Sequence, residues 1–293
     1  MSTIRRHPQG PEGSPGAHGR LFRDRPRVRM GISALPSLFT IGNMFCGYYS
    51  LASTLQQNYD YAAVAIGVGA VLDMLDGRIA RMTHTSSDFG LQLDSLADLL
   101  TFGIAPAVLA LYWGIGSVSG PGEDLYKFAW LATFGFLIAG ALRLARFNVL
   151  ALRPSERASR RHFVGLPIPA AAGVIASIVH FRKAPVTDPV LAIVVCLLLI
   201  ALAFLMISTI RYPSFKDADL RKPLPRSALV ATAMLIVLIF FFSDVVLFLG
   251  ASLYAGSGPA ARALQLVRRR VTNEREKTSP DSPPHPDSRG DLT

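Results

Sequence analysis

The chain has 293 residues, of which 51% are hydrophobic and only 17% are charged, and its formal net charge is +10. Apolar stretches close to the roughly 20 residues that a bilayer-crossing helix needs recur along it, which indicates an all-α, polytopic integral membrane protein and excludes a soluble one. The basic residues lie in the two ends and in loops beside the apolar stretches. This placement fits membrane orientation and contact with anionic lipid headgroups, so we expect no nucleic-acid partner.

The two ends of the chain differ from its middle. Residues 1–30 are rich in Arg, Gly and Pro, and residues 271–293 are polar and Pro-rich. Neither end can bury enough apolar surface to offset the entropy of ordering, so we predict disordered tails around a membrane-embedded domain at 31–270. The start lacks the short apolar core and cleavage site of a secretory signal. The two cysteines, Cys46 and Cys196, lie within predicted spans, which argues against a disulfide framework or a zinc site.

Apolar stretches predict membrane spans in chain order. Six are expected at 34–54, 61–81, 90–113, 127–147, 166–181 and 188–209. A seventh region, 227–267, is apolar for some forty residues, and Ser243-Asp244 could turn the chain between two shorter helices there. We therefore favour eight membrane helices over seven.

Loop charges predict which side each loop occupies. Lys and Arg are concentrated in the N-terminal tail and in the loops at 148–165 and 211–226, and the 82–89 loop, which directly follows Arg81, falls on the same side. The positive-inside rule places this set in the cytoplasm of a cell-membrane protein. Eight helices also bring the basic stretch around Arg269 to that side. The loop at 182–187, with Arg182 and Lys183, is a mild exception.

Aromatic residues predict an interfacial belt. Trp113 and Trp130 are the only tryptophans, and both fall near the outer ends of predicted spans. Such rings are enriched at membrane–water interfaces. We expect both at the outer membrane surface.

Four aspartates interrupt two of the apolar segments. An arc of about 100° on the 61–81 helix holds two of them with two small residues: Asp73, Asp76, Gly77 and Ala80. A stripe with a spacing of four residues follows the 90–113 helix: Gly90, Asp94 and Asp98. Because about eight residues join the two helices, we expect them to be antiparallel neighbours whose acidic stripes face each other near the cytoplasmic surface.

The crowding of these acids has few physical solutions. One acid at the bilayer centre costs roughly 2.5–3.5 kcal/mol on insertion scales, and four ionised carboxylates also repel. They can share protons or bind cations, and converging carboxylate oxygens suit Mg²⁺, Mn²⁺ or Ca²⁺. A structural polar seam is the plainer alternative, but it leaves four acids interleaved with small residues unexplained. Small residues between the acids would let a large ligand approach the metals.

The complete pattern resembles a known family signature. It reads Asp73-x-x-Asp76-Gly77-x-x-Ala80-Arg81, eight residues, then Gly90-x-x-x-Asp94-x-x-x-Asp98, and it is similar to that of the CDP-alcohol phosphatidyltransferases. Four stretches resemble the phosphatidylserine synthase branch: SDFGLQLDSLADLLTFGIAPA, GALRLARFNV, HFVGLPIPAAAG and MISTIRYPSFK. So does LPSLFTIGNMFCG in the first span. The resemblance covers residues 34 to 216.

The resemblance implies transfer of a phosphatidyl group from CDP-diacylglycerol to L-serine, with release of CMP. It implies two divalent ions, Mg²⁺ or Mn²⁺, held by Asp73, Asp76 and Asp94, with Asp98 sharing a metal and acting as general base. It places the nucleotide beside five residues: Gly77, Ala80, Arg81, Thr40 and Asn43. A homodimer among membrane lipids is a further expectation from the family.

The serine carboxylate needs a cationic partner. Candidates near the cytoplasmic end of the fourth span are Arg143 and Arg146, with Asn148 adjacent, because a guanidinium suits a carboxylate. Arginines in such places also commonly only reach lipid headgroups. Arg211 and Lys216 could meet the lipid phosphate, although anchoring is the simpler role, and we interpret His84 as a solvated loop residue.

Other readings stay open at this point. The acceptor could be glycerol 3-phosphate or an inositol compound, although a phosphorylated acceptor needs more cationic groups than serine does. A cation transporter could use the aspartates as its transport site, but the acids cluster near one surface and no broken-helix pairs are seen. A membrane scaffold would leave the acids unexplained.

Overall fold

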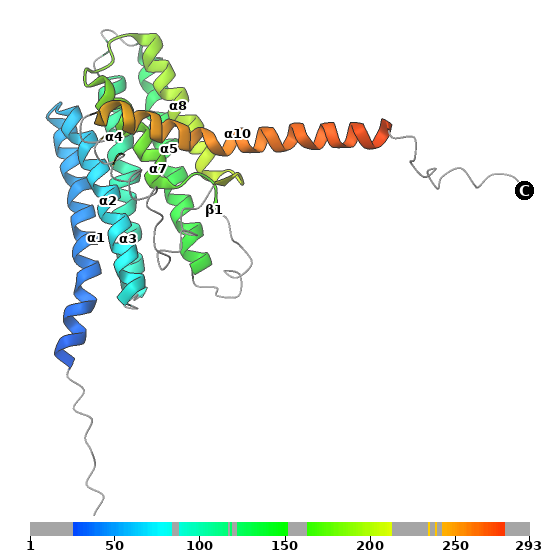
Figure 1. The fold of residues 1–293 in the computed structure, drawn as a ribbon. Coiled ribbons are helices and arrows are strands. Elements are labelled where there is room, and N and C mark those ends of the chain that lie inside the picture. The colour runs from blue at the N-terminus through cyan, green and yellow to red at the C-terminus, as the bar shows by residue number, and fades with distance from the viewer. Residues whose placement is uncertain are drawn as a thin grey trace, which may run out of the picture.

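The computed structural model describes residues 26–83, 88–116, 118, 122–151, 163–212, 234, 238 and 242–278. The expected all-α, polytopic architecture is confirmed (Figure 1). The helices are α1 (Pro26–Leu55), α2 (Tyr59–Thr83), α3 (Asp88–Asp98), α4 (Ala105–Gly114), α5 (Glu123–Ala151), α7 (Ile168–Arg182), α8 (Pro189–Ile207) and α10 (Ser243–Thr278). A π-helical segment, η1 (Leu99–Ile104), joins α3 to α4.

Three helical stretches of the described chain are long and apolar enough to cross a membrane: Phe89–Gly114, Glu123–Leu150 and Pro189–Ile207. Their boundaries follow local signals. Pro189 occupies the first turn of α8, where its missing N–H costs nothing, and the Asp188 carboxylate accepts a hydrogen bond from the Val190 N–H at 3.1 Å. The helix α7 ends at Arg182, because the next residue, Lys183, has a φ of 58° that cannot continue the helix.

The interior is built from small residues that let helices approach closely. Alanines dominate the buried faces of α2, α4, α5 and α7. At Gly69 of α2, an added Cβ would lie 2.6 Å from the Thr101 side chain of η1, and at Gly47 of α1 the same distance separates it from the Thr101 hydroxyl. The helices α1, α2 and η1 therefore meet at two glycines, as membrane helices commonly do.

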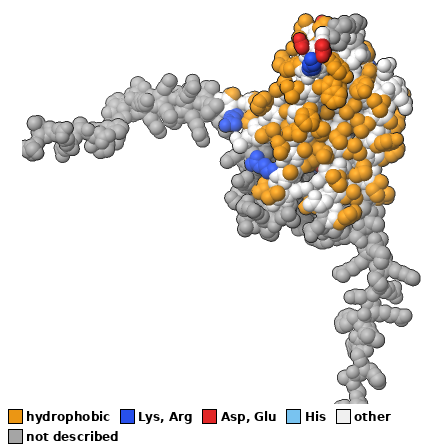
Figure 2. All heavy atoms as spheres, turned by 180° about the vertical axis from the view of Figure 1, so that it is seen from behind, with side chains coloured by type: hydrophobic (Ala, Val, Ile, Leu, Met, Phe, Trp, Pro, Cys, Tyr) orange, Lys and Arg blue, Asp and Glu red, His pale blue; other side chains and the backbone are white. Residues whose placement is uncertain are grey.

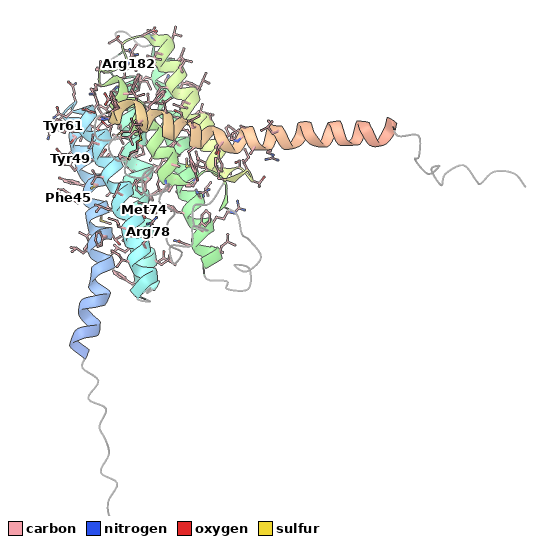
Figure 3. The ribbon with its side chains drawn as sticks, viewed as in Figure 1. Phe45, Tyr49, Tyr61, Met74, Arg78 and Arg182 are labelled. Carbon is pink, nitrogen blue, oxygen red and sulfur yellow. The ribbon has the colours of Figure 1, made fainter. Side chains whose placement is uncertain are left out.

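Large hydrophobic side chains cover the outside. Figure 2 shows one face on which they form a nearly continuous surface, with charged groups at its margins. Phe45 and Tyr49 stack with their ring centroids 6.4 Å apart on the outer side of α1, and Tyr61 projects from the start of α2 (Figure 3). Such a surface is matched to hydrocarbon rather than to water.

A two-stranded antiparallel pair lies near the C-terminal end of α8. Strands β1 (Phe163–Val164) and β2 (Arg211–Tyr212) pair Phe163 with Tyr212. The buried Tyr212 hydroxyl donates a hydrogen bond to the Ala255 carbonyl of α10 at 3.1 Å. Burial, with a smaller contribution from Tyr254, raises the pKa of Tyr212 to about 12, so this donor stays protonated at neutral pH.

The helix α10 begins at Ser243, where a turn is predicted, and runs on to Thr278 across and beyond the bundle (Figure 1). Ser243 lies beside His180 at one end of α7, whereas Ala255 meets Tyr212 near the other end. Tyr212 and Ser243 therefore lie near opposite ends of α7. The count of eight helices stays a prediction, because most of residues 213–241 lie outside the described chain.

The sequence misplaces one tryptophan. Trp130 is 56% exposed, as expected of an interfacial residue, but Trp113 is only 2% exposed. The Trp113 indole N–H donates to the Ala184 carbonyl at 3.0 Å, in the 182–187 loop. Trp113 therefore packs inside the protein, because that loop folds over it and satisfies its one polar atom.

The tail boundaries at 30 and 271 stay predictions. The ribbon of α1 begins at Pro26 and that of α10 ends at Thr278, and the rest of both tails lies outside the described residues.

Candidate active site

Three of the four aspartates converge between α2 and α3. Asp73 and Asp76 extend from α2 and Asp94 from α3, and each offers a carboxylate oxygen within 4.8 Å of the other two. Asp76 is 4% exposed, and the other two are partly buried. The spacing of the acids along each helix has therefore placed them on facing sides, as the helical period requires.

The residues of this cluster fit a divalent cation. The buried Oδ1 of Asp94 has no hydrogen-bond partner among the described residues. A buried carboxylate oxygen without a partner is costly, and three carboxylates at this spacing repel one another. Oxygen-only donors in such an arrangement are what Mg²⁺ and Mn²⁺ prefer, and a bound ion would remove both costs.

The first helix supplies hydrogen bonds to the acids. The Thr40 hydroxyl donates to Asp76 Oδ2 at 2.8 Å, and the Asn43 amide donates to Asp98 Oδ1 at 3.3 Å. Both α1 residues are buried. The sequence suggests Thr40 and Asn43 as nucleotide contacts, whereas the contacts found here are with the aspartates. Such bonds orient carboxylates around a metal.

Asp98 lies outside the group of three, although the charges of Asp73, Asp94 and Asp76 act on it. It is the last residue of α3, and the π-helical η1 starts directly after it. Within η1, the Thr101 hydroxyl donates to the Asn43 backbone carbonyl at 2.8 Å. The π-helical segment therefore directly follows Asp98 and also binds the backbone of Asn43, the hydrogen-bond partner of Asp98. Turns of π-helix are frequent at functional sites.

Open space adjoins the acids at Gly77. A Cβ added there would meet no atom within 4 Å, in contrast to Gly69 on the same helix. Ala80 and Arg81 follow on α2, but their side chains lie outside the described part of the chain. On the same helix, Met74 and Arg78 are exposed (Figure 3). No atom of the described residues therefore covers the surface at Gly77, on the helix that carries Asp73 and Asp76.

The three candidates for acceptor binding on α5 lie in different surroundings. The Asn148 side chain exchanges hydrogen bonds of 2.9 and 3.1 Å with Ser95, the neighbour of Asp94. Arg146 is exposed. The buried Arg143 donates to the Met206 carbonyl at the end of α8 at 3.3 Å, and its guanidinium lies 4.7 Å from the Phe147 ring centre. These contacts bring only Asn148 next to α3.

Arg143 is placed where a cation stabilises the protein itself. The C-terminal carbonyls of a helix carry partial negative charge, and a guanidinium beside them is favourable. Gly165, at the entry to α7, comes so close to Arg143 that an added Cβ would lie 2.8 Å from Nη1. Arg143 therefore joins α5, α8 and the segment after β1.

Several residues of this region escape sequence reasoning. Ser95 directly follows Asp94, and Thr101 is a polar residue in an apolar stretch, but neither position has a spacing that indicates its partner. The π segment has no sequence period of its own that would reveal it. The side chain of Arg211 lies outside the described residues, as do His84 and Lys216 entirely.

Comparison with known proteins assigns this region. Residues 33–207 match the family model of the CDP-alcohol phosphatidyltransferases. The match contains the aspartate cluster and the helices from α2 to α8 that surround it.

Three curated relatives are named CDP-diacylglycerol–serine O-phosphatidyltransferase. The Helicobacter pylori protein is 35% identical over 187 residues, which cover 62% of this chain and 72% of the relative. The Bacillus subtilis protein is 37% identical over 182 residues, covering 62% and 91%. The Methanocaldococcus jannaschii protein is 37% identical over 152 residues, covering 52% and 63%. The chain belongs to the CDP-alcohol phosphatidyltransferase family.

Proposed function

We propose that this protein transfers the phosphatidyl group of CDP-diacylglycerol to the hydroxyl of L-serine, giving phosphatidylserine and CMP. Family membership supports the reaction type, and the names of the relatives from three organisms support serine as the acceptor. The observation that carries the proposal is the convergence of Asp73, Asp76 and Asp94, with a buried Asp94 oxygen that lacks a partner among the described residues.

The three converging aspartates would hold two divalent ions, either Mg²⁺ or Mn²⁺. Asp98 would be a further ligand, shared with one of these ions. When bound, such ions neutralise pyrophosphate oxygens and stabilise the departing CMP. The Thr40 hydroxyl fixes one oxygen of Asp76. The open surface at Gly77 would receive the nucleotide and its phosphates, with Ala80 and Arg81 bordering it.

Asp98 would act as the general base. It would take the proton of the serine hydroxyl while the serine oxygen forms a bond to the phosphorus that carries diacylglycerol. The bond from that phosphorus to the CMP oxygen would break, and CMP would leave with the bonding electrons. The Asn43 amide, bonded to Asp98 Oδ1, would hold the carboxylate in position for this transfer.

Acceptor recognition would involve Asn148, which lies against Ser95 beside Asp94. The exposed Arg146 could reach a serine carboxylate from the same end of α5. Arg143 would contribute less directly, through the joint between α5 and α8. The concentration of Lys and Arg in the loops of this end supports a cytoplasmic active site in the cell membrane, and a homodimer is proposed from the family alone.

CMP release tests this function. Purified protein with Mn²⁺ and CDP-diacylglycerol should release CMP with L-serine, and much less with glycerol 3-phosphate or inositol. Asp98→Asn should lower kcat at least about 100-fold, because the proton acceptor is lost together with one shared ligand, whereas Asp73, Asp76 and Asp94 should still largely keep donor binding. Asp124→Asn, at an exposed position on α5, is the control and should keep full activity.

Each other outcome has a definite meaning. Equal release with another alcohol would make that alcohol the acceptor. An active Asp98→Asn enzyme would refute the general-base role. No CMP release with any alcohol, together with an ion flux through reconstituted vesicles that Asp94→Ala abolishes, would support a transporter instead.

A further inference from the structure

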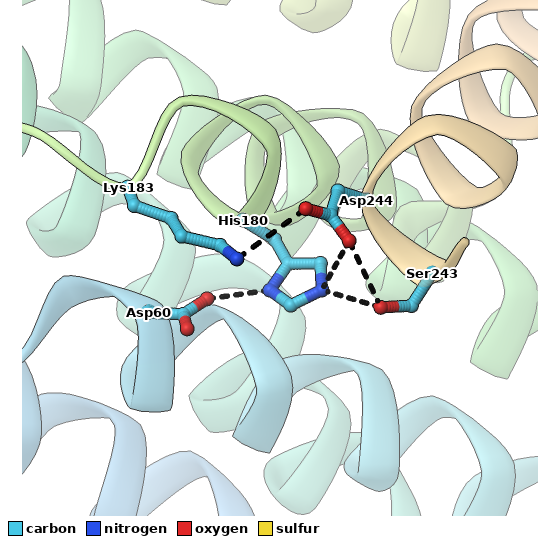
Figure 4. Close-up of polar contacts among 5 residues, drawn as sticks. All are labelled: Asp60, His180, Lys183, Ser243 and Asp244. Atoms are coloured by element: carbon cyan, nitrogen blue, oxygen red, sulfur yellow. Dashed lines mark hydrogen bonds and ion pairs between the residues drawn. The ribbon is translucent and has the colours of Figure 1, made fainter. Parts of the chain in front are cut away.

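A second polar cluster, drawn in Figure 4, contains a residue from the opposite end of α2 to Asp73 and Asp76. It contains Asp60 from the start of α2, His180 from the last turn of α7, the adjacent Lys183, and Ser243 and Asp244 from the first turn of α10. Asp60 precedes Asp73 by 13 residues on α2, which is about 20 Å along a helix. We name these five residues the latch cluster.

Both ring nitrogens of His180 have partners. Nδ1 lies 2.5 Å from Asp60 Oδ1, and Nε2 lies 3.0 Å from the Ser243 hydroxyl. The Ser243 hydroxyl in turn contacts Asp244 Oδ1 at 3.2 Å, and Lys183 Nζ lies 3.3 Å from Asp244 Oδ2. The His180 side chain is only 13% exposed. One imidazole, itself largely shielded from water, therefore connects α2 with α10, whereas the side chains of Asp60 and Asp244 are 42% and 39% exposed.

The directions of these hydrogen bonds depend on the charge of the ring. A protonated imidazole donates from both nitrogens, so it can donate to Asp60 and to the Ser243 oxygen, which leaves the Ser243 hydrogen for Asp244. A neutral ring with its proton on Nδ1 has no second donor. The Ser243 hydroxyl has one hydrogen and must then serve either His180 or Asp244. Only the protonated ring satisfies every contact in the cluster.

The charges favour the same state. The groups that face His180 are the carboxylate of Asp60 from α2, the Ser243 hydroxyl and Asp244 carboxylate from α10, and the nearby Lys183 ammonium. Two carboxylates are balanced by Lys183 and a protonated His180, whereas a neutral ring leaves one negative charge in excess. Arg182 is exposed at this end of α7 (Figure 3).

A catalytic role for Ser243 fits less well. The order Asp60, His180, Ser243 is that of a serine-hydrolase triad. The Asp244 carboxylate, however, touches the same hydroxyl, and it would repel the negative charge that develops on a nucleophilic serine and on a bound oxyanion. The arrangement is therefore suited to holding helices together rather than to attacking a substrate.

We propose that His180 is a protonation-dependent latch that fastens the first turn of α10 to α2 and α7. The consequence reaches further along α10, whose Phe248, Ser252 and Pro259 line an apolar groove of about 370 Å³ against α7 and α8. While the imidazole is protonated, the latch is closed and this wall of the groove is held in place. When the imidazole is neutral, one contact is lost and α10 opens more often.

Hydrogen exchange of the full chain in lipid nanodiscs tests the latch. Peptides from 243–258 are compared at pH 6 and pH 8 with peptides from 189–207 in α8, which removes the intrinsic pH dependence. In the wild type, relative protection of the α10 peptides should fall about tenfold or more from pH 6 to pH 8, the scale of one hydrogen bond to a charged group. In His180→Gln it should be low at both pH values.

Matched variants separate the latch from general destabilisation. Ser243→Ala keeps the His180 ring and both carboxylates but removes the hydroxyl that bridges His180 and Asp244. Asp60→Asn removes the negative charge that faces Nδ1 of His180. Each variant should reduce the difference in protection between pH 6 and pH 8, even if His180→Gln folds poorly. Glu123→Gln removes an exposed ion pair with Lys127 and should behave as the wild type.

Three results would overturn the proposal. The first is wild-type protection that does not change with pH, and the second is a wild-type pH difference retained in both Ser243→Ala and Asp60→Asn. The third is labelling of Ser243 by a fluorophosphonate that His180→Gln abolishes, because that would identify Ser243 as a nucleophile. CMP release plays no part in these measurements, so they stand apart from the test of the proposed reaction.

Discussion

The aspartates are alike in sequence but differ in what holds each side chain. Asp76 accepts a hydrogen bond from Thr40 and Asp98 accepts one from Asn43, whereas a buried oxygen of Asp94 has no partner among the described residues. An oxygen that is buried without a donor is the one most in need of a cation. The carboxylates that have donors are the ones whose orientation is fixed in advance, as neighbours of a metal commonly require.

Replacing Gly77 by alanine should separate ligand binding from stability. The added methyl group meets no protein atom within 4 Å, and alanine is favoured over glycine in a helix by roughly 1 kcal/mol. Gly77→Ala should therefore unfold no earlier than the wild type, yet its KM for CDP-diacylglycerol should rise about tenfold or more, because the methyl group occupies the nucleotide's space.

Two other glycines of α2 serve as controls for that experiment. Gly67 is also open and lies on an exposed part of α2, so Gly67→Ala should leave both KM and stability intact. Gly69→Ala should unfold at a lower temperature, because its Cβ would lie 2.6 Å from Thr101. A wild-type KM in Gly77→Ala would place the nucleotide elsewhere.

Removing the Thr40 hydroxyl should weaken the metal site. Thr40→Val keeps the shape of the side chain but leaves Asp76 Oδ2 without this donor. Mn²⁺ affinity, followed by electron paramagnetic resonance of free Mn²⁺, should fall about 10–100-fold, the usual effect of losing such a partner. Thr54→Val is the control, since the Thr54 hydroxyl bonds only within α1, to the Ser50 carbonyl. An unchanged Mn²⁺ affinity in Thr40→Val would contradict a metal at Asp76.

At the scale of elements, the joint between α5, α7 and α8 depends on a short strand pair. Gly165 follows β1 with a φ of 85°, and the backbone there passes against the Met206 carbonyl and the Arg143 guanidinium. A side chain at this position would need both an unfavourable backbone conformation and space that is not present. The glycine is therefore what allows Arg143 to reach the end of α8.

Gly165→Ala should destabilise the protein by about 2 kcal/mol or more. The new Cβ would lie 2.4 Å from the Met206 carbonyl oxygen. The measurement is thermal unfolding in detergent, with Gly173→Ala on α7 as the matched control, because nothing lies within 4 Å of a Cβ there. Equal midpoints for the two variants would show that the joint tolerates a side chain.

At the scale of the whole molecule, α10 is held at both ends of α7. One attachment is the bond from Tyr212 to Ala255, and the other is the latch cluster. The pair of Lys183 with Asp244 also accounts for the mild exception to the positive-inside pattern, because the carboxylate offsets a basic charge of the 182–187 loop. The apolar groove follows α10 from Phe248 past Ala255 to Pro259, against α7 and α8.

Low pH should weaken the attachment of α10 at the latch cluster, because the Asp244 carboxylate becomes protonated. Hydrogen bonds from its own backbone N–H and from Lys183 hold the pKa of this carboxyl below its ordinary value. A lowered pKa contributes stability that is present above the unfolded value, near 3.9, and is lost as the pH falls through the folded value.

The difference in unfolding temperature between the wild type and Asp244→Asn that is measured at pH 5 should therefore shrink below about pH 4. Glu123→Gln provides the comparison for an exposed acid at the same end. A difference that is unchanged down to pH 3 would show that Asp244 gains nothing from Lys183 in the folded protein.

The sequence by itself determined the membrane class, the main spans and the facing of the acidic stripes, because these depend on hydrophobic length and on a helical period that act locally. Asp73, Asp76 and Asp94 could be placed together from spacing alone, and their motif also pointed to the family.

Only the tertiary structure decided which partners the polar residues find. Spacing cannot reveal that Thr40 and Asn43 face the aspartates, that Arg143 turns toward α8, or that Trp113 is covered by a loop. His180 and Asp60 are 120 residues apart, and no periodic pattern relates them. Their contact exists because packing of α2, α7 and α10 brings three helix ends together, and that packing depends on side-chain shape across the whole bundle.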